Sequence, residues 1–215
     1  MHGTLLTVEL WAAASLIGIA IGFVLALVLS IVAPGKASGP ASWMVRAIRC
    51  YVEFFRGTPL LVQLFLVYAG GPHIGITLGA LTVGIWGLGL YGGAYFTEIF
   101  RAGFAGIPPG QLEAARSFGF ARAQSIRHIV MPQMLVLVIP PFVNMLIILL
   151  KDTAVLSILT IPELTFQVTG MTLETFAFIE PFLALAIVYW VLVEAISLAG
   201  RAAEARLRHS IGLAT

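Results

Sequence analysis

The side chains that could contact a polar solute are few, and they lie in otherwise apolar sequence. Gln63 and Asn144 are amides within long uncharged runs, and Lys151, Asp152 and Thr153 follow directly after the second of these runs. Amide and ionisable groups at membrane depth are costly, so they usually face a cavity or a partner. These residues are therefore the candidates for a substrate pathway or its gate.

Each candidate also has a purely structural interpretation. Asn144 lies three residues after Pro141, where a broken helix would free backbone carbonyls for a solute, but its amide could equally bond a neighbouring helix. For Gln63, packing between helices is the favoured interpretation. Lys151 and Asp152 could simply pair with each other at the membrane rim, with Thr153 beside them. Both sets of interpretations remain open at this point.

The composition indicates the elements that must position these residues. Hydrophobic residues make up 60% of the 215 residues and charged residues only 10%, and the mean hydropathy is +1.01. Soluble chains carry about 25% charged residues, so this chain could not cover a soluble surface. A single cysteine, Cys50, excludes an internal disulfide, and a net charge of +2 is too small to indicate nucleic acid as a partner. The composition predicts an all-α polytopic membrane protein.

Five uncharged or nearly uncharged stretches predict transmembrane helices, because a span needs about 20 apolar residues. They are residues 10–33, 57–71, 77–97, 129–150 and 181–200, within a single transmembrane domain over residues 1–215. The turn sequence Gly70-Gly71-Pro72-His73 separates the second span from the third. Pro140 and Pro141 predict a kink or a break in the fourth span.

The placement of the basic residues predicts the orientation of these spans. Eleven of the 12 Lys and Arg residues fall in loops or tails that share one face, and only Lys151 falls on the other. The positive-inside rule makes the basic face cytoplasmic, which puts the N-terminus outside and the C-terminus inside. The basic face comprises Lys36, Arg46, Arg49, Arg56, Arg101, Arg116, Arg122, Arg127, Arg201, Arg206 and Arg208.

Residues 41–56, before the second span, predict an amphipathic helix at the cytoplasmic interface. Arg46, Arg49, Glu53 and Arg56 recur at helical spacing, and an apolar stripe recurs one position earlier. An elbow that orients the second span is the favoured interpretation. A regulatory or lipid-sensing role is the alternative.

The longest expected cytoplasmic connection, residues 98–128, predicts a short protruding helix. Pro108-Pro109-Gly110 is followed by good helix formers over 111–118, and Gly119 suits a C-terminal cap. A short helix held away from the membrane fits a groove on a partner, although an ordinary solvated hairpin is also possible. The residues of this candidate docking helix are Gln111, Leu112, Glu113, Ala114, Ala115, Arg116 and Gly119. Glu113 and Arg116 are spaced to pair, as are Glu98 and Arg101.

This loop resembles the signature of permease subunits of ABC importers. Glu113-Ala114-Ala115 is followed by three residues and Gly119, then by nine residues, Ile129 and Pro132, with Met131 where the family usually has Leu. Residues 55–63 (FRGTPLLVQ) and 150–156 (LKDTAVL) resemble segments of the polar amino-acid permeases, the subfamily of histidine and glutamine importers. The resemblance covers roughly residues 3–208.

The resemblance implies a type I importer in the bacterial inner membrane. Two permease subunits, identical or homologous, would form the pathway for a polar or charged amino acid. Two ATPase subunits would hold ATP and Mg, and a periplasmic or tethered binding protein would deliver the substrate. The 111–118 helix would be the coupling helix. This chain has no Gly-rich phosphate loop, so we expect no enzyme activity and no cofactor in it.

Other functions receive less support from the sequence. A stand-alone channel or ion-coupled carrier for small polar solutes is the alternative, but no span carries the central charged residue usual for ion coupling. The histidines at positions 2, 73, 128 and 209 lack ligand spacing, so no metal site is expected. No arrangement of nucleophile and base is evident, so no catalytic residues are expected either.

Overall fold

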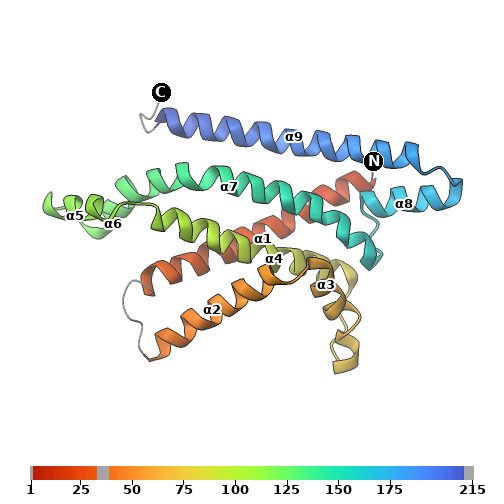
Figure 1. Cartoon of the computed structure of the whole chain (residues 1–215), viewed down its shortest axis with the longest axis horizontal. Coiled ribbons are helices and arrows are strands. Elements are labelled where there is room, and N and C mark those ends of the chain that lie inside the picture. The colour runs from red at the N-terminus through yellow and green to blue at the C-terminus, as the bar shows by residue number, and fades with distance from the viewer. Residues whose placement is uncertain (1, 33–38, 211–215) are drawn as a thin grey trace.

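The computed structural model describes residues 2–32 and 39–210, and over these residues the chain is a bundle of long helices (Figure 1). Residue 33 at the end of the first expected span and Lys36 of the expected cytoplasmic face lie outside the described residues.

The two most closely packed helices are α1 (His2–Val32) and α4 (Ala80–Ala105). Glycines allow this approach. A methyl group added at Gly18 would lie 3.0 Å from the carbonyl oxygen of Gly89, and one at Gly22 would overlap Cβ of Phe96. Small residues that let backbones approach are the usual means of helix packing in membranes, where lipid removes the hydrophobic driving force.

The segment expected as an interfacial helix and second span forms two helices with a sharp bend between them. α2 (Pro40–Gly57) and α3 (Leu60–Tyr68) meet at 104°, with Pro59 at the junction. Proline disfavours a helical conformation in the residue before it, which explains why α2 ends there. α3 has nine residues and is about 14 Å long, too short to cross a bilayer alone. A short 3₁₀ turn follows it (η1, Gly71–Ile74).

The apolar stripe of α2 packs against α1 rather than facing outwards. Val45, Ile48 and Val52 are buried in a cluster with Leu29 of α1. The Tyr51 hydroxyl donates to the Leu90 carbonyl at 2.6 Å, which ties α2 to the middle of α4. The placement of α2 relative to a bilayer surface stays a prediction.

A kink or a break was expected in the fourth span, and the break does not occur. α7 (Met131–Asp152) is a continuous α-helix that contains both Pro140 and Pro141. Only two carbonyls one turn upstream lose their N–H donors, and neighbouring helices tolerate such losses in membrane proteins. The irregular geometry lies earlier, where α6 (Arg122–Ser125) leads through a π-helical turn (Ile126–Val130) directly into α7.

Two helices and a 3₁₀ segment complete the chain. A 3₁₀ segment (η3, Thr153–Leu159) and α8 (Leu164–Thr175) follow α7. α9 (Ile179–Ser210) packs along α7 and extends ten residues beyond the expected end of the fifth span. The sequence did not predict α8 as a helix.

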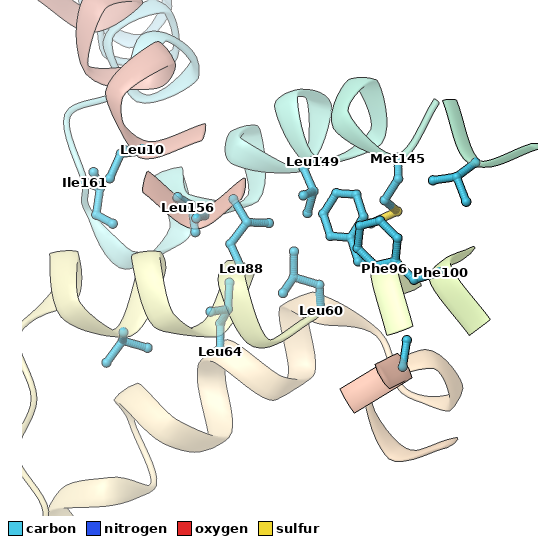
Figure 2. Close-up of a cluster of buried hydrophobic side chains, with 14 of the residues drawn as sticks. Leu10, Leu60, Leu64, Leu88, Phe96, Phe100, Met145, Leu149, Leu156 and Ile161 are labelled. Atoms are coloured by element: carbon cyan, nitrogen blue, oxygen red, sulfur yellow. The ribbon is translucent and has the colours of Figure 1, made fainter. Parts of the chain in front are cut away.

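The core lies where α4 meets α1, α3 and α7. Figure 2 shows Phe96 and Phe100 of α4 facing Met145 and Leu149 of α7, and Leu88 of α4 pointing towards Leu156. Phe96 and Leu88 are fully buried. This central position of α4 matters for function because the protruding loop begins at its end.

Three helical segments are long and apolar enough to cross a membrane: His2–Val32, Ile126–Leu159 and Ile179–His209. The bent pair α2 and α3 would be a fourth if it counts as one span. α4 is less apolar because of its glycines and tyrosines, but its 26 residues span about 39 Å. The all-α membrane fold is therefore confirmed, and a total of five spans is consistent with it.

Candidate functional site

The short helix predicted over residues 111–118 is present as α5 (Pro109–Ser117), which lies beyond the ends of α4 and α7 at one end of the molecule (Figure 1). Pro109 occupies the first turn, where the missing N–H is not needed, and Pro108 before it is extended. The helix starts and ends within two residues of the expected 111–118 range.

One side of α5 anchors the helix and the other is free. Ala115 is buried and Leu112 packs against the hydrophobic core, whereas Glu113, Ala114 and Arg116 are exposed. Within the described residues Glu113 and Arg116 form no ion pair with each other, so their expected pairing is not seen. The free side therefore offers one acidic and one basic group to a partner.

Gly119 closes α5 as predicted. Its φ of +78° is left-handed, which glycine adopts without strain. The N–H of Phe120 donates to the Ala115 carbonyl at 3.0 Å, and the Gly119 N–H donates to the Arg116 carbonyl at 2.9 Å. This pair of bonds is the Schellman arrangement of helix ends.

Two features of this region were not predicted from the sequence. The Gln133 side chain in α7 donates to Oε1 of Gln111 in α5 over 2.7 Å, which links the protruding helix to a spanning helix. Phe118, just after α5, is 84% exposed, and large aromatic side chains of this kind are common anchors in protein interfaces. The only sign of this exposure in the sequence is that Phe118 is a large apolar residue directly after a polar helix.

Gln63 is buried and stabilises the bend between α2 and α3. Its Nε2 donates to the carbonyls of Phe55 and Thr58 at 3.1 and 3.0 Å and to the Thr58 hydroxyl at 2.8 Å. These are acceptors at the end of α2 whose helical partners are lost at the bend. Its Oε1 is buried without a hydrogen bond among the described residues.

The other expected pathway residues are not gathered in one place. Asn144 is exposed on the surface of α7, and Lys151 is exposed at its end. Asp152 is half-buried, and no ion pair joins it to Lys151 in the described part of the chain. Thr153 is fully buried, and its hydroxyl bonds the Leu150 carbonyl at 2.6 Å.

Glu163, which is not among the expected pathway residues, is fully buried at the start of α8. Glu163 caps α8 by accepting from the N–H groups of Thr165 and Phe166, both at 2.8 Å. The hydroxyl of Thr7 in α1 also donates to it at 3.4 Å. Burial raises the pKa of Glu163, and these hydrogen bonds oppose the rise. Glu163 therefore joins α1 to the start of α8.

Glu98 and Arg101 form the expected ion pair at the end of α4. Two hydrogen bonds of 3.0 and 2.6 Å join the guanidinium to both carboxylate oxygens. The bonds from Arg101 lower the pKa of Glu98, partial burial opposes this, and the nearby charges of Arg56 and Arg49 lower it further. Two arginines of α2 thus lie near this pair.

No group of three His, Cys, Asp or Glu side chains lies close enough to hold a metal ion within residues 2–32 and 39–210.

The chain matches a known family over most of its length. The family of binding-protein-dependent transport system inner membrane components matches residues 18–209. A probable glutamine ABC transporter permease protein of Bacillus subtilis (strain 168) is 34% identical over 197 residues, covering 92% of this chain and 89% of that protein. A probable amino-acid ABC transporter permease protein of Vibrio harveyi is 34% identical over 189 residues, covering 86% and 85%.

Solved structures show the same fold. A crystal structure of an amino acid ABC transporter with histidines has a chain 33% identical to this one, with a TM-score of 0.84, covering 95% of this chain and 92% of that chain. An inward-facing methionine ABC transporter matches with a TM-score of 0.77 at 20% identity, covering 96% and 94%, which supports the fold alone.

In this family the ATPase activity resides in separate subunits, so a permease chain is a transport subunit and not itself an enzyme. The family match, the helical bundle and α5 with its Gly119 cap agree with one another. The chain belongs to the binding-protein-dependent transport system inner membrane components and is a multi-pass permease subunit of an ABC importer.

Proposed function

We propose that this permease forms the membrane pathway of an ATP-driven importer for a polar or charged amino acid. The observation that carries the proposal is the construction of α5, whose free side offers Glu113 and Arg116 while its other side is fixed to the bundle. The names of the relatives, which include glutamine and amino-acid permeases, support the substrate class.

The proposed complex contains partners on both sides of the membrane. Two ATPase subunits bind ATP and Mg and receive α5, and a second permease, identical or homologous, completes the pathway. A periplasmic or tethered binding protein delivers the amino acid at the opposite face. In this arrangement the N-terminus lies outside and the C-terminus in the cytoplasm, which agrees with the basic residues near α5 and along the end of α9.

The coupling step follows from the contacts of α5. Closure of the ATPase pair displaces α5, and the Gln133–Gln111 hydrogen bond and the buried Ala115 transmit that movement to α7 and the core. Because α5 is a single short helix with a rigid cap at Gly119, it moves as a unit.

Substrate contacts are proposed at the polar residues of the bundle. Asn144 offers an exposed amide on α7, and Lys151 and Asp152 offer opposite charges at its end, next to Thr153. Gln63 contributes through its unbonded Oε1 at the bend. When a partner permease completes the pathway, these separated groups line it at different points.

Co-purification with the cognate ATPase in mild detergent tests the docking role of α5. The wild-type permease is expected to retain the ATPase, and Glu113→Lys is expected to lose it because the exposed charge is reversed. Glu174→Lys, which reverses an exposed charge on α8, is the matched control and should retain the ATPase. Retention by Glu113→Lys would contradict the docking role, and a stand-alone channel or carrier would retain no ATPase in any variant.

A further inference from the structure

A cavity lies between α1, α2 and α4. The ends of α1 and α4 that line it lie towards the end of the molecule that carries α5 (Figure 1). Its volume of about 650 Å³ falls within the range of small-molecule sites. Charged side chains line it from two helices, and we call it the α2–α4 cavity. Its polar lining comprises Ser30 of α1, Arg49, Glu53 and Arg56 of α2, and Glu98 and Arg101 of α4.

Two of the charged residues that line this cavity are joined to each other by hydrogen bonds. The other three, Arg49, Glu53 and Arg56, are called the open set. Glu98 and Arg101 neutralise each other through two hydrogen bonds. By contrast, Arg49, Glu53 and Arg56 form no ion pair among the described residues. The Arg56 guanidinium lies over the ring of Tyr95, 5.4 Å from its centroid, which fixes its position by a cation–π contact.

The open set has the chemistry that recognises a zwitterion. Glu53 is four residues after Arg49 and three before Arg56, so helical spacing places opposite charges side by side, about 5–6 Å apart at Cβ. Guanidinium groups bind a carboxylate through paired hydrogen bonds. A carboxylate binds an ammonium group through charge-assisted hydrogen bonds. An α-amino acid carries both groups on one carbon, whereas a phosphate group would meet the carboxylate of Glu53 unfavourably.

We propose that the α2–α4 cavity is a release site on the cytoplasmic side, where Arg49 and Arg56 bind the α-carboxylate and Glu53 binds the α-ammonium of the transported amino acid. This inference rests on the proposed function and orientation. It assigns substrate binding to residues outside the set expected from the sequence.

The position of the cavity suits release. The Glu98–Arg101 pair on its wall belongs to the last two turns of α4, and the chain runs from there directly to α5. A displacement of α5 by the ATPase therefore acts on one wall of the cavity. Val52 of α2, also on the lining, is buried against α1 and holds the opposite wall.

Protection of a single cysteine from labelling tests the proposal. In the variant Ser30→Cys, Cys50→Ser, the single thiol of the permease lies in the cavity. A small anionic methanethiosulfonate reagent is then added to this permease assembled with its ATPase, and the rate of thiol labelling is measured. L-Glutamine is the probe, followed by any other amino acid for which the complex shows uptake. Labelling is expected to slow roughly fourfold at about three times the dissociation constant.

Three matched controls make the result specific. N-acetyl-L-glutamine lacks the ammonium group and is expected to give no protection at the same concentration. Glu53→Gln is expected to abolish protection by glutamine, whereas Glu204→Gln, on the end of α9, should leave it unchanged. Cys50 of the wild-type chain is exposed on α2 but does not line the cavity, so its labelling should not respond to glutamine.

The outcomes separate this inference from the proposed function. If the complex imports an amino acid with ATP but that amino acid does not slow labelling at position 30, the release site is wrong and the importer assignment stands. Equal protection by the N-acetylated compound would also overturn the site, because it would then bind any carboxylate. If no amino acid is imported, the proposed function fails and the release site fails with it.

Discussion

Gln133 of α7 donates its side-chain N–H to Oε1 of Gln111 of α5 over 2.7 Å. The two residues are 22 positions apart, and a protruding helix and a spanning helix are thereby joined by a side-chain contact as well as by the chain. Amide pairs of this kind hold two elements in one relative orientation. The contact gives a movement of α5 a direct route to α7.

Replacing Gln133 with Leu should weaken this transmission. Loss of a hydrogen bond worth about 1 kcal/mol corresponds to a factor of about five, so we expect substrate uptake per ATP hydrolysed to fall by about that factor. Simultaneous measurement of uptake and phosphate release in proteoliposomes checks this. Gln167→Leu is the control, because its amide bonds the Pro162 carbonyl away from α5. An unchanged ratio in Gln133→Leu would show that the contact plays no part in coupling.

Gly119→Val should uncouple transport without preventing insertion. Valine is strained at a φ of +78°, by about 1–3 kcal/mol, so the Schellman cap and the direction of the chain after α5 should change. We expect normal levels in the membrane but loss of uptake stimulated by ATP. Gly110→Ala is the control at the other end of α5, where the backbone is not left-handed and nothing lies within 4 Å of an added methyl. Wild-type uptake by Gly119→Val would contradict the role of the cap.

Gly22→Ala should destabilise the packing of α1 on α4. An added Cβ would overlap Phe96 and lie 2.9 Å from the backbone nitrogen of Thr97, so the helices must separate. Overpacking of this kind costs about 1–3 kcal/mol, and the midpoint of thermal unfolding in detergent should fall by several degrees. Gly170→Ala, in α8 with open space around it, should leave the midpoint unchanged or raise it slightly. Equal midpoints for both variants would show that α1 and α4 are less closely packed than described.

Glu163→Ala should lower stability through loss of a buried cap. The substitution leaves the N–H groups of Thr165 and Phe166 without their acceptor and removes the bond from Thr7, at a cost of about 1–3 kcal/mol. The thermal midpoint in detergent is again the measurement. Glu174→Ala, an exposed carboxylate on the same helix, should have little effect. A midpoint for Glu163→Ala as high as that of the control would mean that the cap does not stabilise α8.

The local signals in the sequence predicted the helix α5 and its ends well. Pro109 and Gly119 mark the ends of α5, and each acts through its own backbone preference, so their effect does not depend on the rest of the fold. The Glu98–Arg101 pair was also predictable, because residues three apart on a helix are neighbours. Such features need only a few consecutive residues.

Details of geometry and packing were not predictable. The favoured elbow at residues 41–56 indicated a change of direction before the second span, but not the 104° angle at Pro59 or the bonds of the Gln63 amide to the end of α2. Pro140 and Pro141 predicted a kink or a break, but α7 runs through both residues as one α-helix.

The α2–α4 cavity was missed for a related reason. Its open charges lie on α2 and its paired charges on α4, and the helical spacing of Arg49, Glu53 and Arg56 indicated only the charged stripe of an interfacial amphipathic helix. Only the packing of α2 against α1 and α4 turns that stripe towards a cavity. The sequence spacing alone contains no information about which helix lies opposite.

The central claim is that this permease carries an amino acid inwards at the expense of ATP hydrolysed by partner subunits. The most direct measurement is uptake of radiolabelled L-glutamine and a panel of other amino acids into proteoliposomes that contain the permease, its ATPase and its binding protein. We predict accumulation that requires ATP and Mg on the ATPase side and stops when the binding protein is omitted. Equal flux without ATP, or no flux of any amino acid with all components present, would contradict the account.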